Sequence, residues 1–179
     1  MEWQPGSGHQ TSFAFSIAPV DHWALVDLIA IVSTEHKTTG STSGHALADT
    51  SPLQAARLAD APRRLAGCRG AILEKDFEQF AETVELDSNI MHAVMQTSSP
   101  PLLYWMPATV AVMRAVSSWR KAGLPACYTI DAGPNVHVIC LAEEAGKIAG
   151  LLEAVPGVKQ VLKASPGGPA HLIPAPPKL

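Results

Sequence analysis

The stretch ACYTIDAGPNVHVICL, residues 126–141, holds two β-type runs on either side of a short polar link. The runs cover residues 126–130 and 136–141, and the link between them is DAGPN. Glycine reaches positive φ, proline fixes φ, and an asparagine side chain bonds to nearby backbone, so all three favour turns. The stretch therefore predicts two strands joined by a tight, irregular turn that begins at Asp131.

Helical patterns lie on both sides of this stretch. In residues 53–72 apolar side chains, including Leu58 and Leu65, recur at helical spacing. Thr50 or Ser51 is the expected N-cap, and the helix is expected to break or bend near Pro62. Further helices are expected at residues 77–94, 107–121 and 142–155, and a short strand at residues 158–162.

The N-terminal third adds two strands and a long loop. Residues 12–18 alternate large apolar with small side chains, which is typical of a half-buried strand, and residues 25–32 form the nearly continuous apolar run of a central strand. Residues 33–50 are rich in Ser, Thr, Gly and His, which predicts a loop. This order of elements indicates an α+β fold with helices packed on one face of a mostly antiparallel sheet.

Composition excludes several classes of protein. The 179 residues suit one domain with a buried core, and a net charge of −3 argues against a nucleic-acid surface. There is no apolar run of about 18 residues and no signal-peptide pattern, so we expect a cytoplasmic protein that neither spans nor binds a membrane. The three cysteines and seven histidines lack the spacing of metal ligands, so we expect buried thiols and no metal site.

Two segments have the composition of a binding or catalytic site. Residues 37–45, KTTGSTSGH, combine Lys37 with glycines and hydroxyls that can donate to a phosphate; a solvated connector is the alternative. Asp131, at the end of an apolar strand, is suited to receive or position a hydroxyl proton, or else to bond its own turn. Asn89 and His92 share one helix face, where they line a pocket or form a satisfied core pair.

Five segments in order resemble one family, the diphosphomevalonate decarboxylases of the GHMP kinase superfamily. The most specific is YTIDAGPN, residues 128–135, which looks like the family's signature turn. The others are EWQPG at residues 2–6, His22-Trp23, residues 37–44, and residues 87–93 with the later Pro100-Pro101 and Tyr104. The resemblance covers nearly the whole chain and implies the α+β, ferredoxin-like fold of the GHMP C-terminal domain.

The resemblance also implies an activity and the residues that carry it. The family uses ATP to phosphorylate the 3-hydroxyl of mevalonate 5-diphosphate; phosphate and carbon dioxide then leave, giving isopentenyl diphosphate. By the resemblance Asp131 is the catalytic aspartate, and Ser41, Thr42 and Lys37 are substrate-binding candidates. Similar mevalonate 3-kinases lack that aspartate, so its presence favours decarboxylation. Asn89 and His92 receive no role from the family and remain candidates for lining the cleft.

The resemblance covers only part of the family's two-domain plan. Residues 1–20 are expected to be residual strands of a missing N-terminal domain, residues 21–164 the C-terminal domain, and residues 165–179 an irregular tail rich in proline and glycine. ATP and Mg²⁺ would be bound mainly by the missing domain, present as a separate chain or domain. We expect this chain alone to bind neither and to be inactive.

Alternatives remain open at this point. The chain could belong to a phosphomevalonate decarboxylase, which takes the monophosphate, or be a truncated, non-catalytic module. Without its partner it is expected to expose apolar surface near Trp3, Phe13 and Phe15, and therefore to self-associate as a homo-oligomer or to be marginally stable; the alternative is that residues 1–18 fold back and cover this face.

Overall fold

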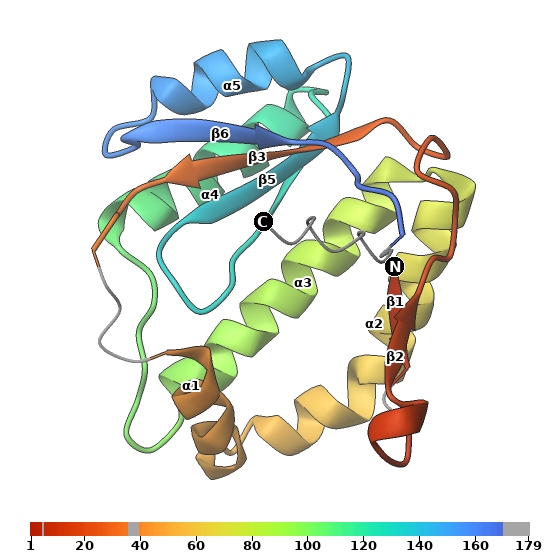
Figure 1. The fold of residues 1–179 in the computed structure, drawn as a ribbon. Coiled ribbons are helices and arrows are strands. Elements are labelled where there is room, and N and C mark those ends of the chain that lie inside the picture. The colour runs from red at the N-terminus through yellow and green to blue at the C-terminus, as the bar shows by residue number, and fades with distance from the viewer. Residues whose placement is uncertain (5, 36–39, 170–179) are drawn as a thin grey trace, which may run out of the picture.

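The computed structural model describes residues 1–4, 6–35 and 40–169 and is centred on a four-stranded antiparallel sheet (Figure 1). The strands stand in the order β4-β5-β3-β6. Their bounds are β3 Leu25–Ile31, β4 Ala126–Thr129, β5 Val136–Leu141 and β6 Gln160–Ala164. The runs on either side of DAGPN are thus neighbouring strands, and Tyr128 pairs with Val138. The predicted α+β class with an antiparallel sheet is confirmed.

The helices begin and end where local chemistry favours it. Their bounds are α1 Ser41–Leu47, α2 Gln54–Glu74, α3 Phe77–Gln96, α4 Pro107–Lys121 and α5 Ala145–Glu153, with short 3-10 turns η1 His9–Thr11 and η2 Ala48–Thr50. The Asp76 carboxylate caps α3 by accepting from the Gln79 N–H at 3.1 Å. Gly123, at φ +90°, follows α4. No helix in the described ranges has an apolar stretch long enough to cross a membrane.

One face of the sheet is covered by α4 and α5 and forms the main core. Because side chains alternate along a strand, Val26, Leu28 and Ala30 of β3 all point into this core. Leu28 and Val138 are fully buried there. Burying a side chain of this size stabilises the fold by about 1.5–3 kcal/mol. The strongest apolar runs of the sequence therefore form the centre of the sheet.

Helix α3 covers the outer edge of β4 with polar side chains. Glu85 accepts from the Tyr128 N–H at 3.2 Å, and the Ser88 hydroxyl accepts from the Ile130 N–H at 3.0 Å. Arg120 of α4 donates to the other Glu85 oxygen at 2.7 Å. These bonds satisfy backbone groups that an edge strand otherwise leaves unpaired. They also fix the backbone that leads into Asp131.

The segment expected to be a loop at residues 33–50 contains a helix instead. Residues 36–39, including Lys37, lie outside the described residues, and α1 and η2 follow from Ser41 to Thr50. Gly40, in an extended conformation, precedes the first turn, where residues 41–43 are all hydroxyl-bearing. Ser and Thr are favoured at helix starts as well as in loops, so composition alone could not separate the two. Figure 1 shows α1 at the C-terminal end of α3.

Helix α2 departs from its predicted packing. Of the two outcomes expected at Pro62, the break does not occur, since α2 is one helix; Figure 1 shows it changing direction between its first and second halves. Leu58 and Leu65, which the periodicity assigned to the apolar face, are exposed, whereas Arg64 is buried. Arg64 donates to Asp60 at 2.7 Å and to Asp87 of α3 at 2.9 Å. The first half of α2 therefore buries a paired charge, which hydrophobic periodicity cannot detect, whereas its second half packs Ala71 and the predicted Ile72 into an apolar cluster.

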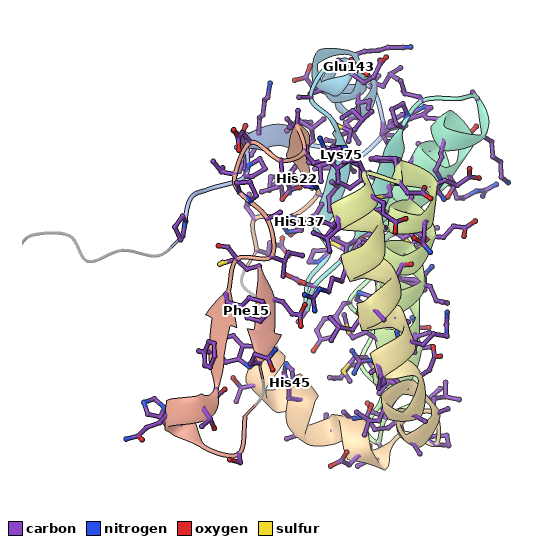
Figure 2. The ribbon with its side chains drawn as sticks, turned by 90° about the vertical axis from the view of Figure 1, so that its right-hand side faces the viewer. Phe15, His22, His45, Lys75, His137 and Glu143 are labelled. Atoms are coloured by element: carbon purple, nitrogen blue, oxygen red, sulfur yellow. The ribbon has the colours of Figure 1, made fainter. Side chains whose placement is uncertain are left out.

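The N-terminal strands form a separate hairpin. β1 (Glu2–Gln4) pairs antiparallel with β2 (Phe13–Phe15), and the hairpin stands away from the four-stranded sheet (Figure 2). The strand predicted at residues 12–18 is thus only three residues long. Trp3 and Phe13 are 62% and 53% exposed, and Phe15 is half-buried, so apolar surface is exposed in this region as expected.

The three cysteines are free thiols. Cys127 and Cys140 are buried in the sheet, while Cys68 of α2 is half-buried. Burial raises the pKa of Cys140 to about 11 and raises the pKa of Cys127 further. These thiols therefore behave as small apolar side chains rather than nucleophiles.

Candidate functional site

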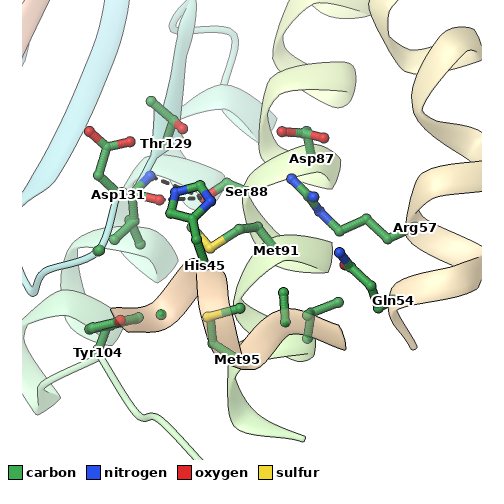
Figure 3. Close-up of a pocket in the computed structure, with 15 residues that line it drawn as sticks. His45, Gln54, Arg57, Asp87, Ser88, Met91, Met95, Tyr104, Thr129 and Asp131 are labelled. Carbon is green, nitrogen blue, oxygen red and sulfur yellow. Dashed lines mark hydrogen bonds between the residues drawn. The ribbon is translucent and has the colours of Figure 1, made fainter. Parts of the chain in front are cut away.

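A cavity of about 530 Å³ opens between the start of α2, the helix α1, the middle of α3 and the turn after β4 (Figure 3). It has two walls of different construction. The α3 wall consists of Ser88 and Met91 with residues 129–132. The α2 wall consists of Gln54 and Arg57, while α1 contributes Gly44 and His45 and the segment after α3 contributes Tyr104. Asp131 stands on the first wall and Arg57 on the second; a further acid, Asp87 of α3, lines the cavity near Arg57 and pairs with Arg64 at 2.9 Å (Figure 3).

Asp131 follows β4 at the point where the strand leaves the sheet. Its side chain is exposed rather than partly buried, and among the described residues its carboxylate accepts no hydrogen bond. The alternative in which Asp131 bonds its own turn is therefore not observed; only its carbonyl does so, accepting from the Gly133 N–H at 2.8 Å. The carboxylate is free to act on a ligand in the cavity.

The turn that carries Asp131 is held from two sides. The Asn135 side-chain oxygen accepts from the Val32 N–H at 2.9 Å and the Ser33 N–H at 3.1 Å. The Thr109 hydroxyl donates to the Pro134 carbonyl at 2.6 Å. Asn135 thus ties the turn to the segment that leaves β3 and leads toward α1. These bonds limit how far the backbone of the turn can move relative to the cavity.

His92 and Asn89 do not line this cavity. His92 is buried, its Nε2 lies 3.1 Å from the Ile130 carbonyl, and its ring packs against Tyr104 and Trp105. Burial lowers the pKa of His92. Asn89 donates to the Tyr128 hydroxyl at 3.0 Å. Both side chains support the α3 wall from behind, which agrees with the alternative of a satisfied polar pair in the core.

The other predicted residues lie on or before α1. Ser41 begins the helix and Thr42, which is exposed, follows it; Lys37 and the side chain of Ser41 lie outside what the structure describes. Later residues of the same helix, Gly44 and His45, do line the cavity with Asp131. A Cβ added at Gly44 would lie 2.7 Å from the Tyr104 hydroxyl. Glycine at this position therefore lets α1 approach the cavity closely.

Sequence reasoning missed the cavity residues of α2. Gln54 and Arg57 are one helical turn apart and extend into the cavity (Figure 3). The signal was present as two polar side chains at i and i+3 beside a predicted N-terminus, but such pairs are usually solvated. Within the described ranges, no group of three or more His, Cys, Asp or Glu side chains could hold a metal ion.

Comparisons with known proteins agree on one family. The model of the mevalonate 5-diphosphate decarboxylase C-terminal domain matches residues 27–170. A diphosphomevalonate decarboxylase of Candida albicans is 37% identical over 155 residues, which cover 84% of this chain and 43% of that protein. The chain therefore spans about two fifths of the length of that relative.

Two solved structures are also similar to this chain in fold. A mevalonate diphosphate decarboxylase from Staphylococcus aureus matches with a TM-score of 0.86 and 27% identity, covering 93% of this chain and 51% of that one. The structure of MDDEF in complex with MVAPP, AMPPCP and magnesium matches with a TM-score of 0.84 and 29% identity, covering 93% and 51% of the two chains.

Proposed function

Since the chain belongs to the mevalonate 5-diphosphate decarboxylase family, by its C-terminal domain, we propose that it supplies the catalytic aspartate for ATP-dependent decarboxylation of mevalonate 5-diphosphate to isopentenyl diphosphate. The observation that carries the proposal is the free carboxylate of Asp131, held at the rim of the cavity by a clamped turn. The matched structure that contains MVAPP, AMPPCP and magnesium supports the choice of substrate and of ATP.

Asp131 would act on the substrate in two ways. Its carboxylate would orient the 3-hydroxyl, as a hydrogen-bond acceptor, for transfer of the ATP γ-phosphoryl group. When phosphate then leaves, the tertiary carbon acquires positive charge, which a carboxylate close by stabilises. The C1–C2 bond breaks, its electron pair forms the new C=C bond, and carbon dioxide departs. A carboxylate without competing hydrogen bonds suits both tasks.

ATP and Mg²⁺ would be bound elsewhere. Among the described residues, no group of three or more His, Cys, Asp or Glu side chains is arranged to hold a metal ion by itself, and Mg²⁺ is commonly held by one or two carboxylates together with nucleotide phosphates. The sequence also has no GxxxxGK[ST] segment that could cradle phosphates. We assign both to an N-terminal GHMP-type domain, with which residues 1–20 would associate. The exposed Trp3 and Phe13 of the hairpin support such a contact, and without it would favour a homo-oligomer.

The test is ATP-dependent release of carbon dioxide from mevalonate 5-diphosphate, measured with this chain, with a family N-terminal half, and with both. We expect release only from the mixture. Asp131→Asn should lower kcat by about 10²–10³-fold with a smaller change in KM, because it keeps the volume and removes the charge. Asp49→Asn, an exposed acid outside the cavity, is the matched control. Unchanged turnover in Asp131→Asn would contradict the proposed role.

A further inference from the structure

The cavity is lined by polar atoms that the fold leaves without partners among the described residues. Among the described residues, Gln54 Oε1, Arg57 Nε and the Tyr104 hydroxyl are buried and make no hydrogen bond. All three belong to side chains that line the same cavity. A buried donor or acceptor without a partner costs about 1–3 kcal/mol, so such atoms rarely gather in one place unless a ligand or water satisfies them.

Arg57 is the charged member of this group. Its side chain extends from α2 into the cavity, opposite Asp131 (Figure 3). No carboxylate of the described chain lies within ion-pairing distance of its guanidinium. The nearby acids are already engaged: Asp60 binds Arg63 and Arg64, and Asp87 binds Arg64 at 2.9 Å. Arg57 is therefore a cation without an acidic partner in a cavity where Asp87 is already paired with Arg64 and Asp131 stands on the opposite side.

We infer that Arg57, with Gln54 beside it, forms a phosphoryl-binding subsite on α2, at the opposite side of the cavity from Asp131. Guanidinium groups bind phosphate oxygens by two parallel N–H bonds, and a buried Nε–H supplies one of them. The acidic side at Asp131 would repel an anion and accept a hydroxyl. The cavity thus fits a ligand with a phosphoryl group at one end and a hydroxyl at the other, a substrate class that rests on the function proposed above.

A carboxylate is the second oxyanion that such a ligand could offer. During decarboxylation the negative charge leaves the carboxylate as the C–C bond breaks, so a guanidinium bound there would stabilise the substrate more than the transition state. A phosphoryl group that stays on the substrate keeps its charge throughout. The chemistry therefore favours the phosphoryl group as the partner of Arg57.

The experiment is an NMR titration of this chain that follows the arginine Nε–H signals. The signal of Arg57 is assigned from the spectrum of Arg57→Lys. Inorganic pyrophosphate, orthophosphate and mevalonate are added separately at constant ionic strength. We expect pyrophosphate to shift the Arg57 signal saturably, orthophosphate to do so more weakly, and mevalonate to leave it unchanged. Arg57→Lys should weaken pyrophosphate binding by about tenfold, because lysine keeps the charge but lacks the planar fork.

Arg63→Lys is the matched control. Arg63 lies on the same helix, is exposed, and pairs with Asp60 at 2.6 Å outside the cavity. Its signal and its lysine variant should be insensitive to pyrophosphate at the same concentrations. A saturable shift of Arg57 by mevalonate but not by pyrophosphate would overturn the assignment in favour of the carboxylate. No saturable shift of Arg57 by any of the three would overturn the subsite itself.

A titration with mevalonate 5-diphosphate separates this inference from the proposed function. If the backbone amides of Ala132 and Gly133 respond while Arg57 does not, the substrate uses the Asp131 side without the α2 subsite, and only this inference fails. If pyrophosphate shifts the Arg57 Nε–H signal while mevalonate 5-diphosphate leaves the amide signals beside Asp131 unchanged, the subsite is supported and the proposed substrate is contradicted.

Discussion

The two walls of the cavity differ in how their polar groups are satisfied. On the α3 wall, Glu85 and Ser88 bond the β4 edge, and His92 bonds the carbonyl just before Asp131. On the α2 wall, Gln54 and Arg57 keep buried atoms without partners among the described residues. The first wall is stabilised by the fold and holds one free carboxylate in place. The second lowers the stability of the fold, because its buried polar atoms lack hydrogen-bond partners. This is expected of a binding surface on which the ligand supplies those partners.

The largest effect should come from removing Glu85, the buried acid of α3 that holds the edge of β4. Glu85→Ala leaves the Arg120 guanidinium and the Tyr128 N–H without their partner, and breaking a mostly buried pair costs about 3–5 kcal/mol. Urea unfolding followed by circular dichroism would measure the loss. Glu82→Ala, exposed on the same helix, should change the free energy of unfolding by less than about 0.5 kcal/mol. Equal losses in the two variants would show that α3 does not hold the edge of β4 through Glu85.

The next effect compares a bonded hydroxyl of the α3 wall with the unpartnered Tyr104 hydroxyl, which also lines the cavity. Ser88→Ala removes the acceptor of the buried Ile130 N–H and should cost about 1–3 kcal/mol. Tyr104→Phe removes a buried hydroxyl that has no partner among the described residues, and should be neutral or stabilising by up to about 1 kcal/mol. Thermal unfolding of the two variants tests the comparison directly. A loss of the same size in Tyr104→Phe would mean that its hydroxyl is bonded in solution and is not an unpartnered group of the cavity.

A smaller effect concerns the close approach of α1. In Gly44→Ala the new methyl would lie 2.7 Å from the Tyr104 hydroxyl, so the side chain or the helix must move. We expect a net loss of about 1 kcal/mol, since overpacking outweighs the helix propensity gained. In the Tyr104→Phe background the loss should disappear, because the clashing atom is gone. Urea unfolding of the four proteins in this cycle gives the coupling, and additive effects would show that Gly44 and Tyr104 do not touch.

Sequence patterns predicted the elements that bury apolar side chains. The strand β5 and the helix α4 appear at their expected bounds, because strict periodicity, a proline at the helix start and a glycine at its end all agree there. The helix α1 was missed because its hydroxyl-rich sequence is equally suited to a loop. The packing of α2 was missed because Arg64, not a leucine, is buried against Asp87.

The site was predicted only in part for a related reason. Asp131 stands out because a specific turn follows it, and its place in the cavity agrees with its predicted role, which remains to be tested. Arg57 and Gln54 have no such local signature: their importance comes from being buried without partners, a property of the packed structure. The same holds for Asn135 and Thr109, whose bonds to residues far away in the sequence clamp the turn.

The smallest predicted effect is the pH dependence of the free energy of unfolding. Its acid-side part comes from His92 of α3. Burial lowers the pKa of His92, so at mildly acidic pH its imidazole is protonated in the unfolded chain while it stays neutral in the native chain. Stability from this group is therefore present above the ordinary histidine pKa of about 6.5 and is lost as pH falls below it.

His137 acts with the opposite sign, outside both walls. It contacts Asp27 at 2.8 Å, and this hydrogen bond raises the pKa of His137. Its contribution is full below about pH 6.5 and is lost as pH rises through the raised pKa. Both side chains are about one third exposed, so we expect only about 0.5 kcal/mol from the pair. Urea unfolding between pH 5 and 8 should show a maximum near neutrality. In His137→Asn the decline on the alkaline side should vanish while the acid-side decline due to His92 remains; an unchanged alkaline decline would show that His137 does not pair with Asp27 in solution.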